Sequence, residues 1–199
     1  MTITLLDYIG MILASPRTIA KILIAERRSI LWGFITVISA SLMLSVNLGY
    51  ILIVKTLGIL GIAIPFIKSV SIIAIVLGTV VGSIIAWLLL GLLLYAFDKA
   101  LDGKASLENI LLVYSFQWIP LFIVGLVSPV FYYLDMVSSI LLLTLVTIIA
   151  LLWGYIIVLI ANAEANGFSL ARSFIASILQ LLIVFSVIVY IPILIGVMI

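Results

Sequence analysis

The sequence contains no cysteine and no histidine. These two absences exclude disulfides, thiolate and imidazole metal sites, and the nucleophile–base pairs of Cys/His or Ser/His catalysis. Charge is also scarce, because only 8% of the 199 residues are Asp, Glu, Lys or Arg, against roughly 25% in soluble domains. A chain so poor in charge cannot maintain a water-facing surface. The small net charge of +2 gives no indication of a nucleic-acid partner.

Enzyme signatures are missing as well. The sequence has no Gly-rich phosphate loop ending in Gly-Lys-Ser/Thr, no Gly-x-Ser-x-Gly turn and no paired intramembrane aspartates. Its seven acidic residues fall in predicted loops or at predicted helix ends. We therefore expect a non-enzymatic protein with no catalytic residue, no cofactor and no metal.

Apolar residues make up 67% of the chain and form repeated runs longer than about 18 residues, the length that crosses a bilayer core as a helix. We expect an all-α membrane protein with two parts, a cytoplasmic and interfacial segment at residues 1–30 and a five-span bundle at residues 31–199. The expected spans cover residues 31–54, 69–97, 107–127, 137–161 and 173–197.

One or two short helices should precede the bundle. Residues 2–14 place their leucines and isoleucines on one helical face, which suits either a helix in the membrane interface or a short helix packed on the bundle. Ser15 and Pro16 are typical of an N-cap followed by proline at the first helical position of a second short helix. Between Lys55 and Lys68 the chain is apolar but too short to cross, so we interpret it as interfacial or partly re-entrant.

The cations predict the orientation. A cytoplasmic N-terminus puts seven of the nine on the cytoplasmic side, namely Arg17, Lys21, Arg27, Arg28, Lys99, Lys104 and Arg172. Lys55 and Lys68 then lie outside. Because cytoplasmic segments of membrane proteins are enriched in Lys and Arg, we expect a multi-pass protein with its N-terminus in the cytoplasm and its C-terminus outside.

The second span carries a stripe of small residues spaced by four: Ala74, Gly78, Gly82 and Ala86. Such a stripe lies on one helix face and lets another backbone approach closely. It can serve packing within this bundle or contact with a second copy of the chain. The first span repeats the pattern with Ser41, Ser45 and Gly49, and the fourth with Ala150 and Gly154.

The third span contains polar residues and a proline within seven positions: Tyr114, Ser115, Gln117 and Pro120. Proline lacks a backbone donor and clashes with the carbonyl four residues earlier, here that of Phe116. The freed carbonyl and the Gln117 amide both need polar partners in a membrane. The segment is either a structural kink or a polar pocket.

Two polar loops should lie on the cytoplasmic side, at residues 98–108 and 162–172, and Ser106 should cap the helix that follows it. Their charged residues are either solvated helix ends or a docking surface for a partner. The candidate docking residues are Asp102, Lys104, Glu164 and Arg172.

At these residues the chain resembles the Yip-domain family of five-span membrane proteins. The stretch from Tyr95 to Ile123 (YAFDKALDGKASLENILLVYSFQWIPLFI) is similar to the family in its helix end, Gly-containing loop and Tyr/Ser-to-Pro helix. The stretch ANAEANGFSLARSFIASIL is similar to the loop before the family's last span, with Gly167, Ser169 and Arg172 in matching places. The short segment ahead of the first span resembles that of prokaryotic members, which implies a location in the plasma membrane of a prokaryote.

Two functions are consistent with these features. The first is a membrane scaffold, adaptor or membrane-organising factor, whose partners are the lipid bilayer and other membrane proteins, with a homo-oligomer as one form. The alternative is a transporter or channel for a small molecule or lipid that uses the kinked third span.

Overall fold

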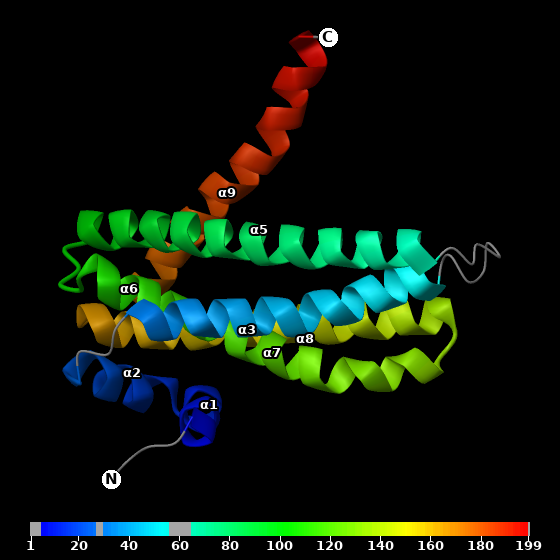
Figure 1. The fold of residues 1–199 in the computed structure, drawn as a ribbon. Coiled ribbons are helices and arrows are strands. Elements are labelled where there is room, and N and C mark those ends of the chain that lie inside the picture. The colour runs from blue at the N-terminus through cyan, green and yellow to red at the C-terminus, as the bar shows by residue number, and fades with distance from the viewer. Residues whose placement is uncertain (1–4, 27–29, 56–64, 199) are drawn as a thin grey trace.

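The computed structural model describes residues 5–26, 30–55 and 65–198, and every regular element in these ranges is a helix (Figure 1). Five helical segments are long and apolar enough to cross a membrane. The predicted all-α fold with short helices ahead of five spans is therefore confirmed.

The two N-terminal helices are α1 (Leu5–Ala14) and α2 (Pro16–Ala25). Tyr8 and Ile12 on α1 and Ile19 and Leu23 on α2 are buried in one apolar cluster with side chains of the bundle. The alternative in which the first helix packs on the bundle is thus observed. Ser15 is the N-cap residue and Pro16 begins α2, as expected, although the Ser15 side chain accepts no capping hydrogen bond.

The first span is α3 (Ile30–Gly49), which continues as the π-helix η1 (Tyr50–Lys55). The second is α5 (Pro65–Ala100), whose 36 residues extend about 54 Å at 1.5 Å per residue. Of the segment predicted to be interfacial or re-entrant, residues 65–68 belong to α5. Residues 56–64 lie outside the described residues, so the two alternatives stay a prediction.

The third span is not one helix but four consecutive segments: α6 (Leu107–Tyr114), the 3-10 turn η2 (Ser115–Gln117), α7 (Trp118–Val127) and the 3-10 segment η3 (Ser128–Tyr133). The 3-10 turn ends three residues before Pro120 and contains Phe116, whose carbonyl lacks the α-helical hydrogen bond that the proline cannot donate. Ser106 caps α6 as expected, because its hydroxyl accepts the backbone N–H of Asn109 at 3.3 Å.

The last two spans are α8 (Met136–Asn166) and α9 (Leu170–Met198). The prediction that a loop begins at Asn162 is wrong by one helical turn. The alanines and the glutamate of the ANAEAN stretch are good helix formers, and α8 ends only at Gly167, which adopts a left-handed backbone with φ 68°. Glycine tolerates this conformation without strain.

The broken third span occupies the centre of the molecule. Helices α3, α5 and α8 lie alongside it, and α1 and α2 cover its flank on the side of α8 (Figure 1). Helix α9 packs its first half against α5 and α8 and then leaves the bundle at a steep angle, so that its C-terminal half stands away from the other spans (Figure 1). The connection between α5 and α6, the end of α8 and the start of α9 meet at one end of the bundle.

Candidate functional site

A carboxylate is buried where α5 ends. Asp98 is only 1% exposed, and both of its oxygens accept hydrogen bonds from amides on α8. Asn162 Nδ2 donates to Oδ1 at 3.0 Å, and Asn166 Nδ2 donates to Oδ2 at 3.0 Å. A buried carboxylate needs such donors, because burial removes it from the water that would otherwise solvate it.

The two asparagines share a helix face because they are four residues apart on α8. Asn166 also donates to Asn162 Oδ1 at 3.0 Å, so the amides hold each other in place. The side-chain oxygen of Asn166 in turn accepts the backbone N–H of Ala105 at 3.1 Å. One side chain therefore joins the last turn of α8 to the carboxylate on α5 and to the loop before α6.

That loop folds tightly over the cluster. The N–H of Gly103 donates to the Asp98 carbonyl at 2.7 Å, and Asp102 before it adopts a positive φ of 63°. A Cβ on Gly103 would lie 2.5 Å from Asn166 Oδ1 and 2.7 Å from the Asp98 carbonyl oxygen. A glycine is therefore required at this position.

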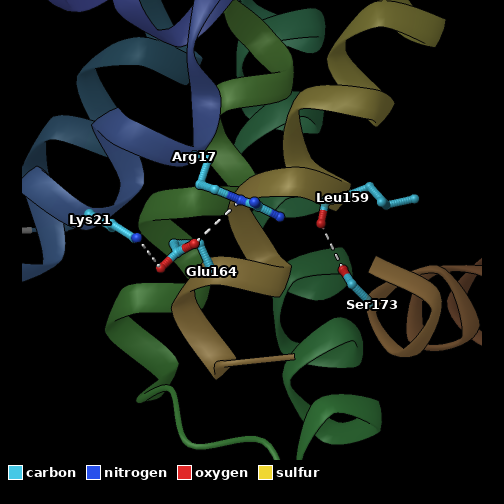
Figure 2. Close-up of polar contacts among 5 residues, drawn as sticks. All are labelled: Arg17, Lys21, Leu159, Glu164 and Ser173. Atoms are coloured by element: carbon cyan, nitrogen blue, oxygen red, sulfur yellow. Dashed lines mark hydrogen bonds and ion pairs between the residues drawn. The ribbon is translucent and has the colours of Figure 1, made fainter. Parts of the chain in front are cut away.

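The cluster reaches α9 through Ser173. Its Oγ accepts from Asn162 Nδ2 at 3.3 Å and donates to the carbonyl of Leu159 at 2.8 Å, a contact drawn in Figure 2. The buried polar cluster of Asp98, Asn162, Asn166 and Ser173 thus connects α5, α8 and α9 at one end of the bundle.

A second contact at this end fixes α2 to α8. Glu164 lies between two cations of α2, with Arg17 Nε at 3.5 Å and Lys21 Nζ at 3.3 Å from its carboxylate oxygens (Figure 2). Both cations are more than half exposed, so each pair contributes little stability alone. Glu164 belongs to the predicted docking residues, yet its charge already serves a contact within the chain.

The other three predicted docking residues, Asp102, Lys104 and Arg172, are exposed at the same end. The guanidinium of Arg172 lies 5.4 Å from the centre of the Phe168 ring. The structure therefore brings the docking set together at one end and leaves three of its four charges open to solvent. Among the described residues, no three acidic side chains gather as a metal site would require.

The polar residues of the third span point in different directions. Tyr114 is buried, and its hydroxyl accepts from Gln180 Nε2 at 3.2 Å and also interacts with the Gln117 side chain. Ser115 faces α3 and donates to the carbonyl of Leu112 at 2.6 Å. Pro120 is buried, and Gln117 is half-buried. The Gln117 side chain thus has a polar partner within its own span, and whether these residues serve a kink or a pocket stays a prediction.

The small-residue stripe of α5 faces outward. Ala74, Gly78 and Gly82 are exposed and Ala86 is half-buried, and among the described residues no outside heavy atom lies within 4 Å of a Cβ built on Gly78 or Gly82. These two glycines therefore do not mediate close packing against any described helix of the bundle. Contact with another copy stays a prediction.

Close packing inside the bundle instead occurs at other glycines. A Cβ on Gly154 of α8 would lie 2.6 Å from the backbone oxygen of Gln117, and one on Gly125 of α7 would lie 2.6 Å from Cβ of Met43. Gly154 was among the small residues singled out in the fourth span, and Gly125 was not.

The buried polar cluster is not predicted from the sequence, because Asp98 is placed in a polar loop whose charges are either solvated or available to a partner. A signal was present in the ANAEAN stretch, whose asparagines four residues apart offer two amides on one face of an apolar helix. Such amides need a polar partner inside the protein.

Comparison with known proteins bears on the whole chain. The sequence matches the family model of the Yip1 domain over residues 9–191. Neither the curated proteins nor the solved structures gave a significant match. The matched range includes α2, all four residues of the buried polar cluster and the greater part of every span. The chain therefore belongs to the Yip1-domain family of membrane proteins.

Proposed function

We propose that this chain is a non-enzymatic membrane adaptor, which holds another membrane protein against the outer faces of α9 and α5. The observation that carries the proposal is the direction of α9, whose C-terminal half leaves the bundle and whose described side chains there include the exposed Phe185 and Tyr190. The proposal is consistent with the family, whose members are multi-helix membrane proteins.

The two halves of α9 differ in their contacts. In the first half Ala176 and Gln180 are buried, and Gln180 Nε2 donates to the carbonyl of Leu90 on α5 at 2.7 Å. Beyond this point Leu182, Phe185 and Tyr190 are 56%, 67% and 62% exposed. A helix that is apolar on all sides is stable when lipid or protein surrounds it. Because its first half is fixed, α9 presents its second half in a defined direction.

The outer face of α5 supports the same proposal. Gly78 and Gly82 lie on it beside the exposed side chains of Leu77 and Val81. Small residues flanked by larger ones let a second helix come close and pack around the gap, a common arrangement between membrane helices.

The transporter alternative receives less support from the interior. The Tyr114 hydroxyl accepts a hydrogen bond from Gln180 of α9, and the Ser115 hydroxyl donates to the carbonyl of Leu112 in its own span. Helix α8 also lies directly against the backbone of Gln117 at Gly154. A transport path along the third span would have to displace these contacts.

The distribution of charge supports a cytoplasmic location for the end that carries the polar cluster. Arg17, Lys21, Lys104 and Arg172 all lie there, whereas Lys55 closes η1 at the opposite end of the bundle (Figure 1). Under the positive-inside rule this end faces the cytoplasm. We infer that the docking residues would meet cytosolic partners and that α9 would meet partners in the bilayer.

Photo-crosslinking in native membranes tests the adaptor proposal. A photoreactive phenylalanine analogue replaces Phe185 on α9, and a matched control replaces Leu141, which is 64% exposed on α8. We expect a discrete protein adduct from position 185 and lipid adducts alone from position 141. A second copy of the chain in the adduct identifies a self-associating scaffold and supports the proposal. Lipid adducts alone from both positions would refute it.

A further inference from the structure

A cavity of ≈ 110 Å³ lies between the N-terminal helices and the bundle. Tyr8 and Ile12 of α1 form one wall, Trp32 and Ile35 of α3 the next, and Phe116 and Phe122 of the broken third span line the far side. The Tyr8 and Trp32 rings stand 5.6 Å apart between their centres. The cavity thus lies where α1 meets α3 and the broken third span.

The walls do not suit water. Two of the hydroxyl groups that line the cavity are already engaged, since Thr36 Oγ1 donates to the carbonyl of Trp32 at 2.8 Å and Ser115 Oγ donates to that of Leu112 at 2.6 Å. A buried water needs two to four polar partners, and apolar cavities stay dry. An empty cavity in turn loses the dispersion contacts that its lining atoms would make. A hydrocarbon group fits such walls.

The cavity opens on a surface that faces the bilayer. Ile35, which lines it, is 49% exposed and lies on one face of α3 with Leu31 and Leu42, which are 56% and 41% exposed. Ser39 also lines the cavity and lies on the same face, between Ile35 and Leu42. The hydrocarbon that reaches this opening is that of the surrounding lipid.

We infer that the cavity between α1, α3 and the broken third span binds the end of one acyl chain of a membrane phospholipid. This end of the chain enters from the bilayer beside Ile35 and lies between α1 and the third span, against Phe116 and Phe122. This binding site is separate from the α5 and α9 faces of the proposed adaptor and does not depend on them.

The first test fills the cavity by substitution. Ser39→Phe places a ring at the opening, and Leu152→Phe places the same ring on α8 as a control, at a side chain that is 61% exposed. Native mass spectrometry of protein purified in mild detergent measures the retained phospholipid. Each methylene excluded from an apolar site weakens binding roughly fourfold, so displacing two should lower retention in Ser39→Phe more than tenfold. We expect the control to match the original protein.

Equal phospholipid retention in Ser39→Phe and the control would overturn the inference, as would an original protein that retains none or retains an isoprenoid lipid instead. Circular dichroism and elution volume establish that the variant is folded.

A second measurement does not depend on the Ser39 variant. The fluorescence of Trp32, taken as the difference between the original protein and Trp32→Phe, is recorded in phosphatidylcholine vesicles with brominated acyl chains. Trp153, which is 46% exposed on α8, is measured in the same way and reports ordinary contact with the bilayer. Trp32 is partly covered at the side of the cavity. We nevertheless expect bromine to quench its fluorescence at least as strongly as that of Trp153. Trp32 fluorescence that bromine leaves unchanged would overturn the inference.

Discussion

At the scale of single residues, the Asp98 carboxylate depends on two amides. Removing a carboxylate from water costs several kcal/mol unless hydrogen bonds replace the lost solvation. Asn162 and Asn166 supply one bond to each oxygen at 3.0 Å. Asn166 also joins the cluster to the loop before α6, because its oxygen accepts the N–H of Ala105.

We predict that Asn166→Ala destabilises the protein by about 2 kcal/mol or more. The substitution leaves a carboxylate oxygen of Asp98 and the N–H of Ala105 without their partner, and an unsatisfied buried group costs about 1 to 3 kcal/mol, more when it is charged. Thermal unfolding in mild detergent measures the change. Asn109→Ala, on the first turn of α6, is the matched control and should shift the midpoint by far less.

Equal midpoints for the two variants would contradict this account of the cluster. Such a result would mean that water reaches Asp98 and takes over the role of the amide.

At the scale of helices, the distance between two spans is shortest where a glycine of one span lies against the backbone of the other. Helix α8 approaches the third span at Gly154, where a Cβ would lie 2.6 Å from the Gln117 oxygen. The approach coincides with the 3-10 turn η2, whose residues come within reach of α8 where the third span changes its geometry. The close approach at Gly154 and the break before Pro120 therefore occur at the same level of the bundle.

We predict opposite effects for two glycine substitutions. Gly154→Ala should destabilise the protein by about 1 to 3 kcal/mol, the usual cost of overpacking, because the Gln117 backbone cannot move aside easily. Gly82→Ala should leave stability unchanged or raise it by up to about 1 kcal/mol, since alanine is the better helix former and a Cβ there meets no described atom within 4 Å. Thermal unfolding in detergent compares the two.

A Gly82→Ala protein less stable than Gly154→Ala would contradict the structure. It would indicate that the α5 stripe packs within the folded chain after all.

The helices themselves were largely predictable from the sequence, whereas their contacts were not. Run length alone located the five spans, because a bilayer demands about 20 apolar residues for each crossing, and Pro120 located the break in the third. The spacing of Gly78 and Gly82 indicates that a helix can approach but not whether it comes from the same chain. The burial of Asp98 depends on residues more than sixty positions away, and nothing in its own loop indicates that they will meet it.

At the scale of the whole molecule, one end collects most of the described charge. Arg17 and Lys21 of α2 pair there with Glu164 of α8, and the exposed side chains of Lys104 and Arg172 lie at the same end. The aromatic η3 segment lies at the other end, where the fully exposed Tyr133 is suited to a membrane interface.

We predict that the charged end faces the cytoplasm. The native chain has no cysteine, so single substitutions report their position without a background. Lys104→Cys and Ser169→Cys should react with a membrane-impermeant maleimide only after the cytoplasmic side is opened. Tyr133→Cys, at a side chain 93% exposed in the structure, should react in intact cells. Labelling of position 104 in intact cells, with position 133 protected, would reverse the orientation.

The buried polar cluster also has a consequence for synthesis. Asp98 precedes its first amide partner, Asn162, by 64 residues. A ribosome adding about 5 to 20 residues per second needs roughly 3 to 13 s to supply that partner. During this interval the carboxylate at the end of α5 depends on water or lipid headgroups for its hydrogen bonds. Asp98 therefore acquires its buried hydrogen bonds only after the last turn of α8 has been synthesised, long after α5 itself is complete.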